Sequence, residues 1–409
     1  MRRVVITGAG PVSAIGVGME AFAAGLRAGR TGIAEPADAD ESSTGGRLAA
    51  RLRDFSVDPF VETPKAYLDR SSAFALAALS LAVRDSGLGQ ETLASAGLAL
   101  GSAFGSLETM AVFYEGLLAK GPRLVKPVLF PHTYANTAIS LLAIEYGIRG
   151  YHINFSAGST AGALALVSAF DAIRQGKADV MFAGGYEALN GYVIAGCDLE
   201  GRLTSAATLA EWAGPFSADR DGLVAGEGAG VLTLETLEHA RARNAHVYGE
   251  LAGAGVYSDS TVDRDMNGGA GVAEAMRRAL ADAGLASGAI DCVSASANGS
   301  VALDGNEAAA IRSVLGGASA RTPVTAIKSL TGDTLGASGA LQSIAAMASL
   351  EEDLIPATAG FEAPEKGMSL KIVCGEPSTG HGLRHIMVNV IDSGGGVVSL
   401  VFAKGDGAA

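Results

Sequence analysis

Apolar positions along the chain form two kinds of pattern: short runs rich in β-branched residues, and longer stretches in which apolar residues recur with helical spacing. The runs that predict strands are Arg3–Thr7, Leu98–Gly101, Tyr151–Phe155, Asp179–Ala183, His246–Ala252, Cys292–Ala295, Val324–Ile327, Lys371–Val373, His385–Val390 and Val397–Phe402. The stretches that predict helices are Val17–Ala28, Thr63–Leu88, Leu107–Leu118, Ser159–Gln175, Gly271–Ala283, Asn306–Val314 and Ala337–Leu350. This alternation of strands and helices is typical of largely parallel sheets covered by helices.

The order of strands and helices recurs after about residue 245, although no sequence repeat of short period is visible. A chain of 409 residues is too long for one hydrophobic core. We therefore predict an α/β protein with a duplicated architecture, whose two halves are residues 1–250 and 251–409.

Composition narrows the class of protein. Apolar residues make up 48% of the chain, which excludes disorder, and a net charge of −13 without any Lys/Arg run excludes nucleic acid as a partner. No stretch approaches the roughly 18 apolar residues that a membrane span needs. The three cysteines form no CxxC pair and the six histidines have no metal-ligand spacing. We expect a cytoplasmic protein without a metal or a membrane anchor.

Two short motifs invite a chemical interpretation. Gly8-Ala-Gly10 follows a predicted strand, but Pro11 interrupts the turn and the third glycine of a dinucleotide site is missing, so we predict a structural turn. Ser159 lies at a predicted strand-to-helix junction, where backbone N–H groups favour an anion. A serine nucleophile also needs an adjacent base, and none of the six histidines lies in a segment suited to that role.

Four longer motifs carry a resemblance to a known family. They are Arg2-Arg-Val-Val-Ile-Thr-Gly8, Gly101-Ser-Ala-Phe-Gly-Ser-Leu-Glu-Thr109, Arg174-Gln-Gly-Lys-Ala-Asp-Val-Met-Phe-Ala-Gly-Gly185 and Pro215-Phe-Ser-Ala-Asp-Arg-Asp-Gly-Leu-Val-Ala-Gly-Glu-Gly-Ala-Gly230. Over nearly its whole length the chain resembles the β-ketoacyl synthases. The resemblance implies a thiolase-like fold, in which the duplicated α/β halves form five layers, α-β-α-β-α.

The resemblance also identifies three catalytic positions, and all three are changed. Active members use a cysteine that accepts the acyl chain and two histidines that stabilise the enolate oxygen formed on decarboxylation. The cysteine position falls on Ser159, the first histidine position on Ser296, and the second on Asp333. A serine without a base is a weak acyl acceptor, and an ionised Asp333 would repel an enolate. We predict that the chain has no catalytic residues of its own and no cofactor.

Two further features of the family bear on this site. Glu307 and Lys328 keep the family's residue types, and we predict a partly buried structural ion pair that Asp333 joins. The glycine- and phenylalanine-bearing gating loop is replaced by Asn389-Val-Ile-Asp-Ser-Gly-Gly-Gly396. Loss of the aromatic gate agrees with a site that is no longer loaded.

A retained fold with erased catalytic residues resembles the chain length factors of type II polyketide synthases. The resemblance implies a heterodimer with an active ketosynthase α subunit, whose interface shapes the tunnel that measures the polyketide. The acyl chain would arrive on the phosphopantetheine of an acyl carrier protein. Chain length factors for aromatic polyketides usually carry glutamine where this chain has Ser159, so we expect a different product, for example a reduced or polyene chain.

The predicted helix Leu107–Leu118 corresponds to the segment that lines this tunnel in the family. Phe113 and Tyr114 both lie one helical turn after Met110, and we predict that these three residues form the tunnel floor. The competing interpretation is that the stripe is ordinary core.

Two other functions stay open. The chain is a standalone acyltransferase or hydrolase if Ser159 acts as a nucleophile with Asp333 as an unusual partner. It is an active ketosynthase homodimer if its unconventional residues support condensation.

Overall fold

The fold is built on one long mixed sheet. A computed structural model describes residues 2–36, 45–259 and 266–405. The sheet contains twelve strands, and β2 (Gly16–Val17) pairs only at its margin with β1. The other strands, in spatial order, are β13 (Lys371–Ile372), β11 (Pro323–Thr325), β10 (Cys292–Ser294), β15 (His385–Ile391), β16 (Gly396–Lys404), β9 (Gly249–Ser258), β1 (Val4–Ser13), β8 (Gly228–Thr236), β6 (Val180–Glu187), β4 (Gly97–Ser102) and β5 (His152–Ser156).

Twelve α-helices and two small two-stranded sheets complete the described part of the chain. The helices are α1 (Met19–Arg27), α2 (Arg70–Ser86), α3 (Gln90–Ser95), α4 (Leu107–Lys120), α5 (Thr137–Tyr146), α6 (Ala161–Arg174), α7 (Gly191–Leu199), α8 (Leu237–Ala242), α9 (Ala270–Ala283), α10 (Val301–Leu315), α11 (Lys328–Thr331) and α12 (Ser338–Glu352). The small sheets pair β3 (Ala49–Ala50) with β7 (Ala225–Gly226), and β12 (Leu354–Ile355) with β14 (Ser378–Thr379).

The sheet repeats one topology twice. In the N-terminal half the order β1-β8-β6-β4-β5 has two antiparallel pairings followed by two parallel ones. In the C-terminal half the order β9-β16-β15-β10-β11 has the same sequence of pairings. The halves join where β1 pairs with β9, through Val5↔Glu250 and Ile6↔Gly249. This repetition confirms the predicted duplication. The predicted boundary at residue 250 falls on the second residue of β9, and the division into two units stays a prediction.

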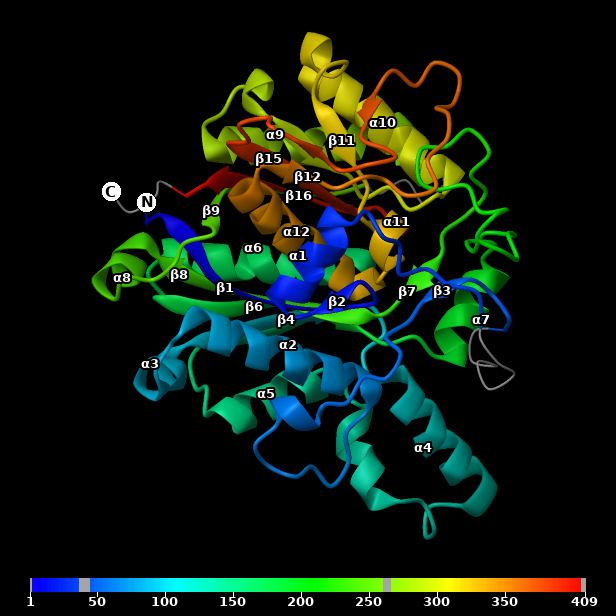
Figure 1. The fold of residues 1–409 in the computed structure, drawn as a ribbon. Helices are drawn as coiled ribbons and strands as arrows, with labels where there is room; N and C mark the ends of the chain where they lie inside the picture. The colour runs from blue at the N-terminus through cyan, green and yellow to red at the C-terminus, as the bar shows by residue number, and fades with distance from the viewer. Residues whose placement is uncertain (1, 37–44, 260–265, 406–409) are drawn as a thin grey trace.

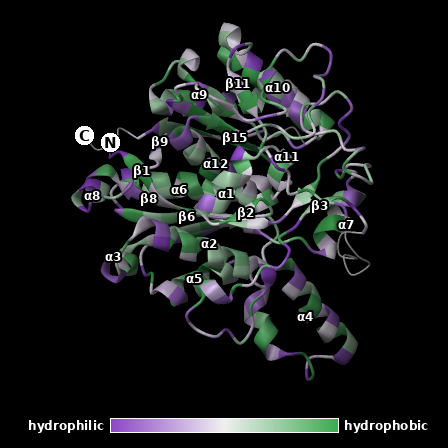
Figure 2. Cartoon of the chain, in the orientation of Figure 1, coloured by the Kyte–Doolittle hydropathy of each residue, from purple (hydrophilic) through white to green (hydrophobic). Residues whose placement is uncertain are grey.

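Helices complete five layers, as expected. Figure 1 shows α2 and α5 on one outside, α9 and α10 on the other, and α6 and α12 between the two halves of the sheet. The central helices are made of small and apolar residues, and Ser338–Leu350 of α12 is buried on every side. A helix that is buried all round can sit only inside the molecule. Apolar residues accordingly concentrate on the central elements, whereas α3 and α8 at the margin carry hydrophilic ones (Figure 2).

Three differences between the expected elements and the structure have a clear local cause. The helix expected over Thr63–Leu88 begins only at Arg70, because the Asp69 carboxylate accepts a hydrogen bond from Ser72 N (3.0 Å) and caps the helix there. The expected turn at Gly8-Ala-Gly10 is wrong: β1 continues to Ser13 with a bulge between Ile6 and Gly8. The helix expected from Ser159 is a 3₁₀ turn, η4 (Gly158–Thr160), followed by α6.

Candidate functional site

The three positions that the resemblance assigns to catalysis lie at the ends of neighbouring elements and are all buried. Ser159 sits in η4 after β5, Ser296 follows β10, and Asp333 follows α11. Lys328 Nζ contacts both Ser296 Oγ (3.4 Å) and Asp333 Oδ2 (3.3 Å). Ser296 Oγ in turn accepts a hydrogen bond from Ile391 N (3.0 Å), the residue next to Asp392. Asp392 accepts a hydrogen bond from Ser159 N (2.8 Å), so the structure connects all three positions.

Asp333 is held as a carboxylate. Its Oδ2 accepts from the Asn298 amide (2.7 Å), and its Oδ1 accepts from Leu335 N (3.0 Å) and Ser338 Oγ (3.1 Å). Burial alone would raise the pKa of Asp333, but the Lys328 ammonium and these hydrogen bonds outweigh it and hold the pKa below its ordinary value. A negative charge therefore stands at the position that the resemblance assigns to the second histidine.

Glu307 behaves in the opposite way. Burial raises its pKa to about 7, against the opposing effect of hydrogen bonds from Ser296 N (2.9 Å) and the Asn389 amide (3.0 Å). Its second oxygen, Oε2, is buried without a hydrogen-bond partner. The ion pair expected between Glu307 and Lys328 is not formed at contact distance in the described residues; Lys328 pairs with Asp333 instead, because that carboxylate lies at the end of the same short helix.

Ser159 has no histidine beside it in the described residues. It is 3% exposed, and among the described residues no hydrogen bond joins its Oγ to a side chain. The six histidines have other surroundings: His132 packs on Tyr67, His152 contacts Gly150 O, His239 pairs with Glu235, His246 with Glu351, His381 contacts Ser378, and His385 contacts Ala289 O. None of the six histidines is therefore placed to act as the general base that a serine nucleophile requires.

The loop between β15 and β16 closes over Ser159. Asp392 Oδ1 accepts from Ser159 N, and Asp392 Oδ2 accepts from Gly394 N (2.7 Å). The approach depends on Gly158, whose φ is 56° and where a Cβ would lie 2.1 Å from Asp392 Oδ1. Sequence reasoning noted that this loop departs from the family but missed the role of Asp392. The only signal was an acidic residue inside a glycine-rich segment.

Glu187, which sequence reasoning also missed, ties the site to the start of α4. Its carboxylate accepts from Ala103 N (2.7 Å) and Phe104 N (3.3 Å) in the loop before α4, and from Gly336 N (3.3 Å) just after Asp333. Burial raises the pKa of Glu187 to about 7, against these hydrogen bonds. The contacts fix the entry to α4 relative to the degenerate positions.

The tunnel candidates on α4 differ in burial. Phe113 is buried; its ring meets Tyr114 edge to face (5.7 Å between ring centroids) and packs at a tilt on Phe130 (5.6 Å). Met110 is 37% exposed, Tyr114 is 53% exposed and Phe130 is 50% exposed. Together with Tyr134, which packs on Phe130 (5.5 Å), these side chains form an exposed aromatic cluster. Figure 1 shows α4 extending beyond the stacked layers, so the cluster is not part of the central core.

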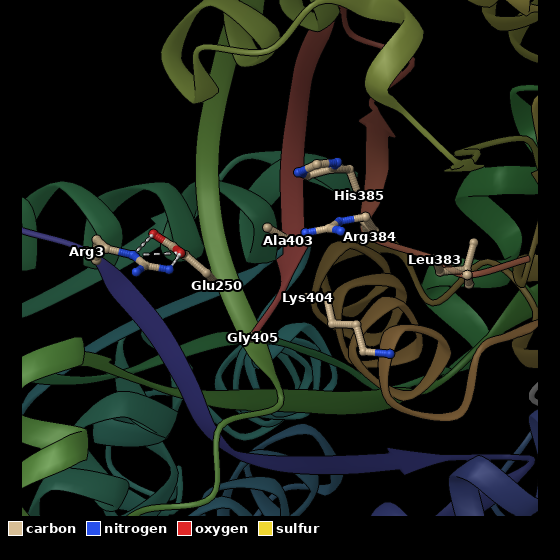
Figure 3. Close-up of a pocket in the computed structure, with 9 residues that line it drawn as sticks. Arg3, Glu250, Leu383, Arg384, His385, Ala403, Lys404 and Gly405 are labelled. Atoms are coloured by element: carbon tan, nitrogen blue, oxygen red, sulfur yellow. Dashed lines mark hydrogen bonds and ion pairs between the residues drawn. The ribbon is translucent and has the colours of Figure 1, made fainter. Parts of the chain in front are cut away.

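Two cavities have different relations to the site. A cavity of about 560 Å³ is lined by Asn298, Ser300, Ser393 and Gly394, and therefore adjoins the Asp333 network and the Asp392 loop. A second cavity, of about 520 Å³, lies at the other end of β15 and β16 (Figure 3). There Arg3 donates to both oxygens of Glu250, and the cavity contains none of the expected positions.

Two other kinds of site have no candidate in the described residues. Within residues 2–36, 45–259 and 266–405, no three His, Cys, Asp or Glu side chains are grouped as metal ligands. No helix in the same residues is long and apolar enough to cross a membrane.

Two family models match the chain. One is the β-ketoacyl synthase N-terminal domain, over residues 1–240, and the other is the β-ketoacyl synthase C-terminal domain, over residues 248–362. Among curated proteins, the 3-oxoacyl-[acyl-carrier-protein] synthase 2 of Vibrio cholerae is 34% identical over 98% of this chain and 99% of its own length. Its namesake in Staphylococcus aureus is 31% identical over 98% of both chains.

Solved structures share the whole fold. The ishigamide ketosynthase/chain length factor matches with a TM-score of 0.91 and 32% identity, over 99% of both chains. A type II PKS ketosynthase, solved in complex with its acyl-carrier protein and bound to the hexaketide, is in a structure that matches with a TM-score of 0.88 and 28% identity, over 99% of this chain and 100% of that one. A β-ketoacyl synthase from Burkholderia phymatum gives 0.89 and 31%, over 99% and 100%.

Proposed function

The chain belongs to the β-ketoacyl synthase family, and we propose that it is a non-catalytic subunit that pairs with an active ketosynthase and shapes a tunnel controlling polyketide chain length. Membership alone does not decide this, since the curated relatives are named as synthases. The observation that carries the proposal is the set Ser159, Ser296 and Asp333 at the three catalytic positions.

Each change removes one part of the condensation chemistry. Ser159 has no histidine beside it to activate its hydroxyl, so it is a far weaker acyl acceptor than a thiolate. Ser296 Oγ is already engaged by Ile391 N and Lys328. Asp333 carries a negative charge where an enolate oxygen would need a donor. The described site thus lacks both the nucleophile and the donor pair.

The proposed partner is a ketosynthase with an intact Cys-His-His set. Support comes from the likeness to the ishigamide ketosynthase/chain length factor and from the exposed aromatic cluster around Phe130, which is typical of a protein interface. The acyl carrier protein would be engaged mainly by the ketosynthase, because a subunit of charge −13 attracts an acidic carrier weakly. The product we propose is a reduced or polyene chain, since Ser159 replaces the usual glutamine.

Co-expression tests this proposal. We expect the neighbouring reading frame to encode a ketosynthase with an intact Cys-His-His set. The chain should co-elute with that ketosynthase, and only the complex should convert malonyl carrier protein to polyketide. Condensation by the chain alone would support an active homodimer and overturn the proposal, as would failure to co-elute.

The tunnel role is tested at Phe113. In the reconstituted complex, Phe113→Ala should shift the product distribution to longer chains, because it removes the buried ring between Tyr114 and Phe130. Leu118→Ala, at a side chain 85% exposed on the same helix, is the matched control and should leave the distribution unchanged. An unchanged distribution in Phe113→Ala would show that the ring does not limit the length of the product.

The alternative is a standalone acyltransferase or hydrolase that uses Ser159. It requires an adduct of one acyl group on Ser159 after incubation with an activated acyl thioester, visible by intact mass. We expect no adduct, and we expect the complex to keep its activity when Ser159 is replaced by alanine.

A further inference from the structure

Asp392 accepts a hydrogen bond from the Ser159 N–H, a backbone donor that an acyl-binding site would need to leave unoccupied. In serine and cysteine acyl enzymes, the nucleophile's own N–H is a donor to the oxyanion of the tetrahedral intermediate. In this chain the N–H of Ser159 donates to Asp392 Oδ1 at 2.8 Å. The donor that would hold an acyl oxygen is therefore already occupied by a side chain of the same molecule.

The surrounding backbone is arranged to keep this contact. Asp392 N donates to Gly396 O (2.8 Å) and Gly395 N donates to Asp392 O (3.0 Å), so the residue sits in a closed turn between β15 and β16. The second carboxylate oxygen accepts from Gly394 N (2.7 Å). On the other side, Gly158 leaves the space that the carboxylate fills, where any larger residue would clash at 2.1 Å.

We propose that Asp392 is an internal occupant of the acyl-oxygen site: its carboxylate takes the place of the acyl oxygen on the Ser159 N–H and closes the degenerate site to acyl groups. This rests on the proposed non-catalytic function and adds a mechanism to it. Loss of the nucleophile removes the reaction, whereas Asp392 removes the binding site. Acyl chains in the complex would then pass to the tunnel without being held at Ser159.

The test gives the site a reporter thiol. In a Ser159→Cys background, the introduced thiolate would attack the carbonyl carbon of an octanoyl thioester of N-acetylcysteamine, form an octanoyl thioester on the protein and release N-acetylcysteamine. Adding Asp392→Gly should speed adduct formation at least about tenfold, since one oxyanion donor is worth a hundredfold or more in comparable sites. Equal rates with and without Asp392→Gly would overturn the proposal.

Two further variants test whether the faster reaction comes from freeing the Ser159 N–H, from removing a negative charge, or from a general loss of rigidity. Asp392→Asn keeps an oxygen acceptor without the charge, and its rate should stay close to that of the Ser159→Cys parent. A rate equal to that of Asp392→Gly would overturn occupancy as the cause. Asp353→Gly removes another carboxylate that caps two backbone N–H groups, those of Gly382 (3.0 Å) and Leu383 (2.8 Å), and should not change the rate.

A second measurement needs no chemistry at Ser159. In the otherwise unaltered chain, Asp392→Ala should increase hydrogen exchange in the peptide that contains the Ser159 amide, with an unchanged melting temperature as the check on folding. Unchanged exchange there would overturn the contact. Neither experiment involves the ketosynthase, so their failure leaves the co-elution test intact, and failure to co-elute leaves the Asp392 contact intact.

Discussion

Lys328 stands beside two buried carboxyl groups that respond to burial in opposite ways. Asp333 receives the ammonium group and three hydrogen bonds and has a lowered pKa. Glu307 lacks the contact, leaves Oε2 unpartnered, and has a pKa raised to about 7. Burial disfavours a charge unless neighbours compensate it, so the geometry around each oxygen decides its charge state.

This difference predicts a pH-dependent stability. A carboxyl whose pKa is about 7 in the folded state and about 4.3 in the unfolded chain binds its proton more tightly when folded. Its contribution is complete at low pH, and the free energy of unfolding falls as pH rises from about 4 to 7. Glu307→Gln should match the parent near pH 4 and exceed it by about 1–3 kcal/mol at pH 8 in urea denaturation.

Glu274→Gln is the control for this measurement. Glu274 lies in a half-exposed pair with Arg278 on α9, and its substitution should leave the pH profile unchanged. A Glu307→Gln profile parallel to the parent's would show that Glu307 is already charged near pH 4.

A second prediction concerns the Lys328–Asp333 pair. Asp333→Ala should lower the free energy of unfolding by about 3–5 kcal/mol, because it leaves a buried ammonium without its carboxylate. Lys328→Met combined with Asp333→Leu should be less damaging than Asp333→Ala, since no buried charge remains. Arg2→Ala, in the exposed pair with Asp179, should change stability by less than about 1 kcal/mol. A double variant that is no better than Asp333→Ala would refute the charge argument.

At the scale of the element, α2 and β1 explain why one expected turn is a strand. β1 pairs with β8 along almost its full length, and α2 packs across it. A Cβ at Gly10 would lie 1.9 Å from Ala78 O. The absence of a side chain at Gly10 therefore allows α2 to pack closely on β1, and the glycine does not mark a turn. A glycine-rich sequence is compatible with either a turn or a strand that packs closely on a helix. Only the packing partner, about 70 residues away in the chain, distinguishes the two.

The contact predicts opposite effects for one substitution at two sites. Gly10→Ala should lower the free energy of unfolding by about 3 kcal/mol, because the new methyl group would clash with a backbone oxygen that cannot move away as a side chain could. Gly116→Ala in α4, where the nearest atom to the new Cβ is 4.0 Å away, should raise it by about 0.5–1 kcal/mol. Chemical denaturation measures both, and a Gly10→Ala protein as stable as the parent would contradict the packing account.

The sequence predicted local features of elements and sites better than long-range ones. Periodicity found α4 and α12 nearly to their ends. The assignment of Ser159, Ser296 and Asp333 to catalytic positions stays a prediction. Sequence reasoning missed β8, a central strand whose Gly-Ala-Gly start resembles a loop. It also missed Asp392 and Glu187, because their roles come from backbone N–H groups more than 80 residues away. Such contacts leave no periodic signal in the chain.

At the scale of the whole molecule, the two halves share a topology but differ in what surrounds the shared layers. Figure 1 shows α4 extending from the N-terminal half, outside the central layers. Phe113 and Tyr114 of α4 pack with Phe130 and Tyr134 into one aromatic cluster. Exposed aromatic side chains that pack together in a cluster are more typical of an interface than of a monomer's free surface. Our last prediction therefore treats the cluster as part of the partner contact.

Phe130→Glu should reduce co-elution with the ketosynthase at least about tenfold, because truncating a central aromatic residue and burying a charge each cost an interface more than about 1.4 kcal/mol. The isolated chain should melt within about 2 °C of the parent, since half of Phe130 is already exposed. Val17→Glu, at a 36% exposed position on β2, is the matched control and should co-elute normally. Normal co-elution of Phe130→Glu would place the partner on another face and would also separate the aromatic cluster from the tunnel that we propose.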